Sequence, residues 1–291
     1  MRSASRDARA GTVSRAAPAP RPTRGRRPRA RRAPPLALLV PALAGAALLI
    51  TPLAALVAAA PWADLPRLAT SPEVVQALGL SLRTATVATA ACMLVGVPLG
   101  WVLARGDLPG LGVLRALVTV PLVLPPVVGG VALLMLLGRR GLLGRHLDAW
   151  FGVTLPFTPA AVVVAQAFVA LPFLVVSVEG TLRATDPAVE DAAATLGAGR
   201  WYVVRRVTLP RVAPGIAAGA VLCFARALGE FGATLTFAGS FPGTTRTMPL
   251  AIALALERDP DAAVALSLVL VALSLAVLVA LRGRWVGGVR A

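Results

Sequence analysis

The chain has 291 residues, 57% of them hydrophobic, and its mean hydropathy of +0.78 is too apolar for a soluble domain of this length. The net charge of +16 includes no lysine, and a phosphate-binding P-loop needs that residue, so the chain is not expected to hydrolyse ATP. His146 is the only histidine, which leaves a histidine-based metal site or triad without partners. We therefore expect an all-α polytopic membrane protein with no catalytic residues, no metal and no cofactor of its own.

Residues 1–35 form a basic segment with 11 arginines, many alanines and prolines, and little that could pack. We interpret it as a disordered cytoplasmic tail that can lie on anionic lipid, where each arginine is worth ~1 kcal/mol. With Asp7, this tail carries +10 of the net charge and leaves +6 for the rest, so a nucleic-acid partner is not expected. A signal peptide is not expected either, because the following apolar run is too long and Pro61 follows the only candidate cleavage site.

Six apolar runs are long enough to cross a bilayer, which requires about 20 mostly apolar residues. The first precedes a core over residues 78–281 that contains the other five, and residues 282–291 form a second tail. Cys92 and Cys223 lie in separate runs and are expected to be buried packing residues rather than a disulfide. The six runs are 36–60, 84–104, 116–138, 158–178, 212–238 and 262–281.

Two dipeptides interrupt the run at 116–138. Pro125-Pro126 and Gly129-Gly130 could break a helix beside a transport pathway. Equally, they could serve only to let neighbouring helices pack closely, and both interpretations stay open.

A charged loop over residues 183–213 separates two of the runs and contains a short helical pattern. Thr185 or Asp186 can cap this helix, and Pro187 suits its first turn. Acidic residues follow, where they favour the positive end of the helix dipole. Three alanines then keep one face thin, and Gly197 is a natural C-terminal stop. The pattern predicts a short, rigid knob, although an ordinary loop with an interfacial helix would share much of it.

Seven positions in this loop match, at fixed spacing, the cytoplasmic coupling loop of ABC importer permeases. That pattern is an acidic residue and two alanines, a glycine after three residues, an aliphatic residue after nine more, and then Leu-Pro. The matching residues here are Asp191, Ala192, Ala193, Gly197, Val207, Leu209 and Pro210. Asp191 stands where the family usually has glutamate, and Glu190 beside it keeps the acidic character. The resemblance implies that Glu190 and the matching residues couple the chain to a cleft in an ATPase subunit.

The run at 212–238 carries two charges, Arg226 and Glu230, which face each other at i and i+4 on a helix. Each is expensive alone in a membrane, so the two are expected to pair. One interpretation is a structural ion pair, and the other is a gate or pathway element.

Further segments resemble permeases for molybdate and, more distantly, sulfate, over roughly residues 78–281. The runs at 234–239 and 246–252 favour molybdate or tungstate, with sulfate or thiosulfate as the alternative. The resemblance implies the six-helix type I ABC importer permease fold. It also implies ABC ATPase subunits that use ATP, an external oxyanion-binding protein and a second copy of the chain. Hydroxyl donors for a passing oxyanion could come from Thr234, Thr236 and Thr247. The segments that carry the resemblance are 124–130, 136–138, 225–234, 237–239, 242–247 and 249–252.

The distribution of arginine along the chain predicts how the protein is oriented in the cell membrane. Both tails, the loop at 183–213 and the loop holding Arg105 and Arg115 contain 21 arginines, and we expect this side to be cytoplasmic. Six arginines lie opposite, at positions 67, 139, 140, 145, 246 and 258. An ion-coupled secondary transporter, with Arg226 and Glu230 as a charge relay, is the alternative from another class. An intramembrane enzyme is discounted because that pair would be its only reactive site.

Overall fold

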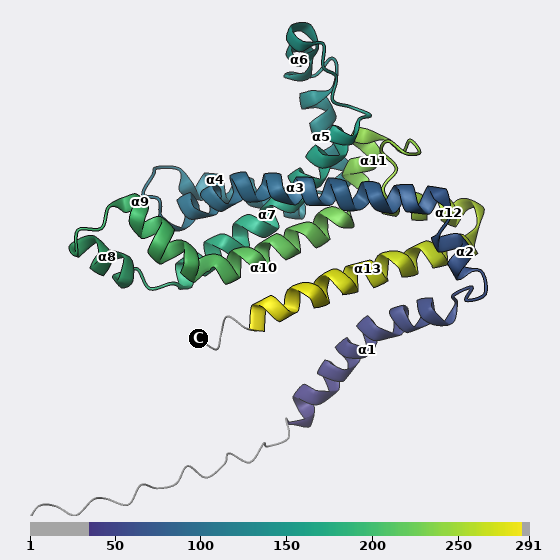
Figure 1. The fold of residues 1–291 in the computed structure, drawn as a ribbon, viewed down its shortest axis with the longest axis horizontal. Coiled ribbons are helices and arrows are strands. Elements are labelled where there is room, and N and C mark those ends of the chain that lie inside the picture. Colours follow the sequence, from purple (N-terminus) through teal and green to yellow (C-terminus); the bar gives the residue numbers. More distant parts are fainter. Residues whose placement is uncertain (1–34, 287–291) are drawn as a thin grey trace, which may run out of the picture. The chain divides into compact units, whose positions relative to one another are not determined.

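The computed structural model describes residues 35–286, and the regular elements in this range are helices (Figure 1). The all-α prediction is confirmed. The chain divides into two compact units, residues 1–50 and 51–291, and the boundary falls inside α1 (Leu36–Ala58). By itself, α1 is a 23-residue helix without a charged side chain, long and apolar enough to cross a membrane. The expected tail at 1–35 lies outside the described residues except for Pro35, as do residues 287–291.

Three long helices form the core of the second unit: α3 (Pro72–Arg105), α7 (Pro159–Ala184) and α10 (Leu209–Leu228). Small residues let them approach closely, as membrane helices require. A Cβ atom on Gly100 would lie 2.9 Å from Cβ of Val178. Cys92 and Cys223 are buried in this core as free thiols, as the sequence predicted.

The run expected at 116–138 is not one straight span. It consists of α4 (Leu111–Val123) and α5 (Pro126–Leu137), whose axes differ by 118°. Leu124 between them is extended, with φ −65° and ψ 133°, because a residue before proline is pushed out of the helical region. Within residues 35–286, five helices can therefore cross a membrane by length and composition, or six if the bent pair is one span.

The run expected at 212–238 is also divided. The first helix, α10, ends at Leu228, and a short turn leads to the separate helix α11 (Gly232–Ala238). The span instead extends toward the N-terminus, through α9 (Arg200–Val203) and a π-helical turn, η1 (Val204–Thr208). Glu230 explains the division, because its carboxylate binds the first turn of α11 and so starts a new helix.

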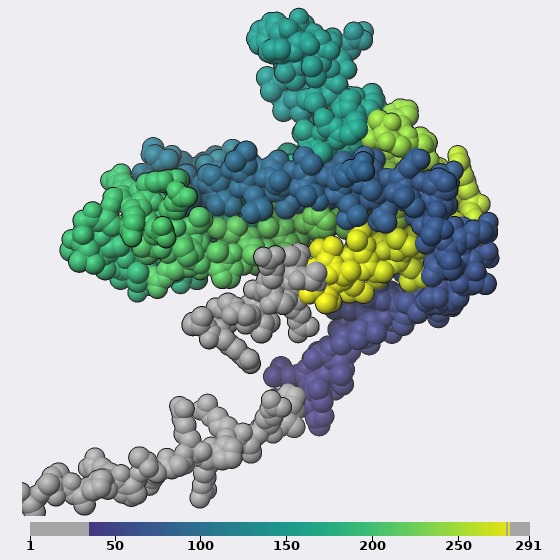
Figure 2. Space-filling model, viewed as in Figure 1, coloured from purple at the N-terminus to yellow at the C-terminus, as the bar shows by residue number. Residues whose placement is uncertain are grey.

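The remaining helices lie outside this core. They are α2 (Leu65–Ala69), α6 (Gly144–Phe151), α8 (Ala188–Thr195), α12 (Met248–Arg258) and α13 (Pro260–Val286). The last helix continues to Val286, so residues 282–286 of the expected second tail are helical. The hydroxyl of Ser81 accepts a hydrogen bond from the Met248 N–H at 2.7 Å and joins α3 to α12. Within the second unit, α5 packs against α7 and α11 at one end and extends away from the bundle of α3, α7 and α10 toward α6 (Figures 1 and 2).

Candidate functional site

The predicted knob is present as α8, which lies between α7 and α9 at one end of the bundle (Figure 1). Asp186 begins it, since its Oδ1 accepts a hydrogen bond from the Ala188 N–H at 2.9 Å. Glu190 and Asp191 occupy the first turn, near the positive end of the helix dipole. No residue of α8 is buried, so the alanine face is open to a partner.

Gly197 stops this helix with a left-handed backbone conformation, at φ +86°. The Ala198 N–H donates to the Ala193 carbonyl at 3.1 Å, and the Gly197 N–H donates to the Ala194 carbonyl at 3.0 Å. This pair of bonds is a Schellman motif, which satisfies the last carbonyls of a helix. It leaves the side chain of Leu196 fully outside the fold, at 89% exposure. The end of the knob is therefore fixed by backbone geometry and carries an exposed apolar tip.

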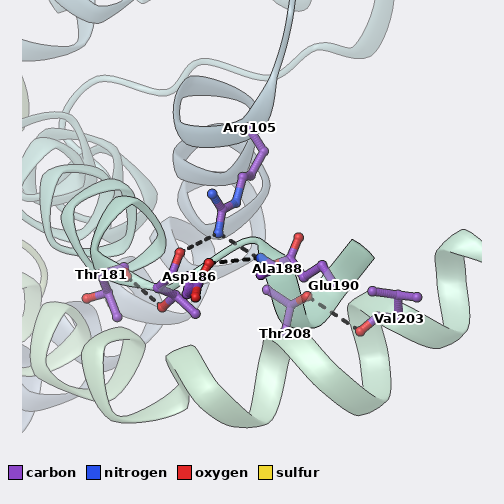
Figure 3. Close-up of polar contacts among 8 residues, drawn as sticks. Arg105, Thr181, Asp186, Ala188, Glu190, Val203 and Thr208 are labelled. Atoms are coloured by element: carbon purple, nitrogen blue, oxygen red, sulfur yellow. Dashed lines mark hydrogen bonds and ion pairs between the residues drawn. The ribbon is translucent and has the colours of Figure 1, made fainter. Parts of the chain in front are cut away.

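Arg105, at the end of α3, holds the start of the knob in place (Figure 3). Its Nη2 donates to the Thr185 carbonyl at 2.9 Å and lies 3.4 Å from Oε1 of Glu190. Glu190 thus faces the bundle, and Asp191, which is exposed, is the acidic side chain left for a partner. Sequence reasoning missed Arg105 because 85 positions separate it from Glu190 and no local pattern links them.

Leu209 and Pro210 begin α10 directly after the π-helical turn. Proline has no N–H to donate, and the first turn of a helix is where this loss costs least. Two open grooves lie near this turn, one along it and one at the end of the knob, and Tyr202 lines both. One of about 580 Å³ is lined by Trp201, Tyr202, Arg205, Arg206 and Pro210. The other, of about 470 Å³, is lined by Ala193, Leu196, Gly197, Ala198, Gly199 and Tyr202. The structure thus brings both ends of the predicted coupling pattern to one exposed surface.

Arg226 and Glu230 form the predicted ion pair, with Nη1 and Oε2 separated by 2.6 Å. The Glu230 side chain is 1% exposed and that of Arg226 is 26% exposed. The other oxygen of Glu230 accepts a hydrogen bond from the Ala233 N–H at 2.8 Å, and so caps α11. One oxygen of Glu230 is therefore hydrogen-bonded to the backbone of α11, while Oε2 contacts Arg226 as an ion pair that lacks hydrogen-bond geometry. Both contacts lie within the protein, which favours the structural interpretation in this conformation.

The proline and glycine pairs serve different purposes. Pro125 and Pro126 produce the break between α4 and α5. Gly129 and Gly130 lie beyond the break, inside α5, where they allow close packing. A Cβ atom on Gly129 would lie 2.9 Å from the Phe168 ring, and one on Gly130 would lie 2.7 Å from Cβ of Thr236. The helix break is confirmed for the prolines and close packing for the glycines, while a transport pathway beside the break stays a prediction.

The three threonines do not gather around an open path in this conformation. Thr234 and Thr247 are fully buried, and among the described residues their hydroxyls have no hydrogen-bond partner. The Thr236 hydroxyl donates to the Gly232 carbonyl at 2.9 Å within α11. An oxyanion could reach Thr234 or Thr247 only after the surrounding helices separate.

The described chain is thus a bundle of apolar helices, each able to cross a membrane by length and composition, with the short helix α8 protruding between two of them. Residues 96–287 match the family described as binding-protein-dependent transport system inner membrane component, and the chain belongs to that family.

Among its relatives is a Mycobacterium tuberculosis protein named molybdenum transport system permease protein ModB. The two are 52% identical over 211 residues, which are 72% of this chain and 80% of the relative. An Escherichia coli protein named sulfate transport system permease protein CysT is 38% identical over 206 residues, or 70% of this chain and 74% of the relative. A solved bacterial ABC transporter that imports alginate has a TM-score of 0.71 at 17% identity, covering 86% of this chain and 93% of that one. This structural likeness supports the fold alone.

Proposed function

We propose that this chain is the transmembrane permease subunit of an ATP-driven importer of molybdate. The observation that best supports this proposal is the exposed α8 knob, which ends in a Schellman motif, in a chain 52% identical to a protein named as a molybdenum transport permease. The chain carries out no bond-making step. Its reaction is vectorial: an oxyanion passes inward across the cell membrane.

The energy for this movement comes from ATP hydrolysed on separate ABC ATPase subunits. Each ATPase takes one α8 knob in a cleft, with Asp191 and the alanines at positions 192–194 against it and Glu190 held back by Arg105. Because each chain has one knob, two copies of the chain match two ATPases. Closing of the ATPases moves the knobs, and the two bundles then open to the opposite side of the membrane.

An external binding protein delivers the oxyanion to this homodimer. Both termini and the α8 knob lie on the cytoplasmic side, a proposal supported by the arginine excess there. Thr234, Thr247 and the Arg226–Glu230 pair remain candidates for a pathway or gate that forms when the helices separate. Tungstate, sulfate and thiosulfate are the alternative substrates.

Proteoliposomes test this proposal. The permease is reconstituted with its ABC ATPase, ATP is enclosed in the vesicles, and the binding protein and labelled molybdate are added outside. We expect uptake that requires ATP and the ATPase, and that unlabelled molybdate or tungstate suppresses far more strongly than sulfate. Suppression by sulfate at equal concentration would instead assign a sulfate permease. Uptake that continues without the ATPase would assign an ion-coupled secondary transporter.

A further inference from the structure

A cluster of charged side chains joins three helices at the same end of the bundle as the α8 knob. Glu179, near the end of α7, is buried, with 8% of its surface exposed. Two arginine side chains contact the same oxygen of its carboxylate. The Arg115 Nε of α4 donates to its Oε1 at 2.7 Å, and Arg183 Nη2 lies 3.0 Å from the same atom. In the sequence, the sign of this cluster is that Glu179 directly follows the apolar run at 158–178.

The same two arginines also bind α3. The Leu103 carbonyl lies in the last turn of that helix, where carbonyls lack helical donors. It accepts from Arg115 at 3.1 Å and from Arg183 at 3.3 Å. Each guanidinium therefore bridges a carboxylate on α7 and a carbonyl on α3, which a planar group with several N–H donors can do at once. Arg115 adds α4 as the third helix.

This cluster is the main polar contact between α4 and the helices α3 and α7. None of its residues is buried, and Arg115 is its only charged side chain. Both contacts of that guanidinium go to the cluster. A helix that buries no residue is weakly fixed by packing, so its position depends strongly on such a contact. Because α4 continues through the break at Leu124 into α5, a contact that fixes the position of α4 also fixes one end of the bent α4–α5 segment.

The cluster is adjacent to the support of the knob. Leu103 is two residues from Arg105, which binds the Thr185 carbonyl and Glu190 at the start of α8. Glu179 lies one and a half turns before the end of α7, which leads directly into α8. A displacement of the knob therefore reaches the last turns of α3 and α7, and these are the two elements to which Arg115 is bound.

We infer that Glu179 is a positioning residue which, through Arg115, locks α4 to the coupling end of the bundle. Movement of the α8 knob is thereby transmitted to the bent α4–α5 segment. This inference rests on the proposed function, since it assigns the route by which ATP-driven movement reaches the spans. Without the Glu179 charge, Arg115 and Arg183 repel each other, and α4 keeps only the contact from Arg115 to the Leu103 carbonyl, while the knob keeps its own support at Arg105.

The test is Glu179→Gln in the complete complex of permease, ATPase and binding protein, reconstituted with enclosed ATP. We expect normal co-purification of the ATPase and continued ATP hydrolysis. The number of oxyanions delivered per ATP should fall at least about fivefold, the lower end for energetic coupling between two sites. Arg139→Gln is the matched control, because it removes an exposed ion pair to Asp148 in α6, and it should keep the parent ratio.

Arg115→Lys provides the second variant should Glu179→Gln fail to accumulate. Lysine keeps the charge, but its single ammonium cannot span the Glu179 carboxylate and the Leu103 carbonyl as the guanidinium does. We expect normal abundance and a lowered transport-to-ATP ratio. A parent-like ratio in an accumulating Glu179→Gln variant, or in Arg115→Lys, would overturn the inference. An unmodified complex that shows no ATP-driven oxyanion uptake would instead refute the proposed function.

Discussion

Replacing Glu230 by alanine removes two interactions at once. It strands Arg226, whose Nη1 lies 2.6 Å from the carboxylate, and it uncaps the Ala233 N–H at the start of α11. Breaking a buried charge pair costs ~3–5 kcal/mol, and a lost N-terminal cap costs ~1 kcal/mol. Because the Arg226 side chain is 26% exposed and so only partly enclosed by protein, the lower end of this range applies. We therefore expect Glu230→Ala to destabilise the protein by about 3 kcal/mol.

Two further variants separate the charge from the cap. Glu230→Gln keeps an oxygen that can accept from Ala233 but loses the negative charge, so we expect a smaller cost of about 2 kcal/mol. In the double variant Arg226→Met with Glu230→Gln, no charge is stranded and the cap remains. It should lie within about 1 kcal/mol of the parent, because the penalty comes mainly from the unpaired charge.

Thermal melting of the detergent-purified variants measures this order of stability. A Glu230→Ala variant that melts with the parent would show that the two side chains do not interact in the membrane. A double variant no more stable than Glu230→Ala would show that the stranded charge is not the cause. Oxyanion uptake by the double variant is the second measurement: normal uptake supports a structural pair, and a stable but transport-defective variant assigns the pair to the pathway.

Three other predictions concern close contacts and assembly. Gly197→Trp should keep normal abundance but lose uptake and ATPase co-purification, because it adds bulk at the end of the knob and a tryptophan is strained at a φ of +86°. Gly197→Asn is the control: asparagine tolerates this backbone conformation, so uptake should be retained. Gly130→Ala should lower the melting temperature, at a cost of about 2 kcal/mol, since the new Cβ meets Thr236 and the Ala233 carbonyl; Gly79→Ala, with open space around it, should not. Native mass spectrometry of the complex should give two permease and two ATPase chains, and one permease per two ATPases would contradict the homodimer.

Local sequence patterns were sufficient to predict the knob and the ion pair. The cap at Asp186, the stop at Gly197 and the i, i+4 charges of Arg226 and Glu230 each depend on neighbours within one or two turns. Such features follow from backbone geometry and from the cost of stranding a charge. They are present in the structure at the predicted residues.

Features that depend on distant residues or on helix direction were not predicted. The run at 116–138 is continuous in hydropathy, which does not record the 118° change of axis at Leu124. The run at 212–238 likewise gave no sign that Glu230 would cap a new helix. The supports of the knob and of α4 depend on Arg105 and Arg115, which meet their partners across 85 and 64 positions.

The π-helical turn η1 gives a physical meaning to the spacing between Gly197 and Leu209-Pro210. Each residue of an α-helix turns the chain by about 100° around the axis, and a π-helical turn accommodates an extra residue. Deleting one residue between Val204 and Thr208 would allow a regular α-helix and would leave the knob at nearly the same angle about the axis of α10, because the wider π-helical turn absorbs that residue. This segment can therefore gain or lose one residue without turning the knob away from its partner, whereas one residue lost from the regular helix beyond it would turn the knob by roughly 100°.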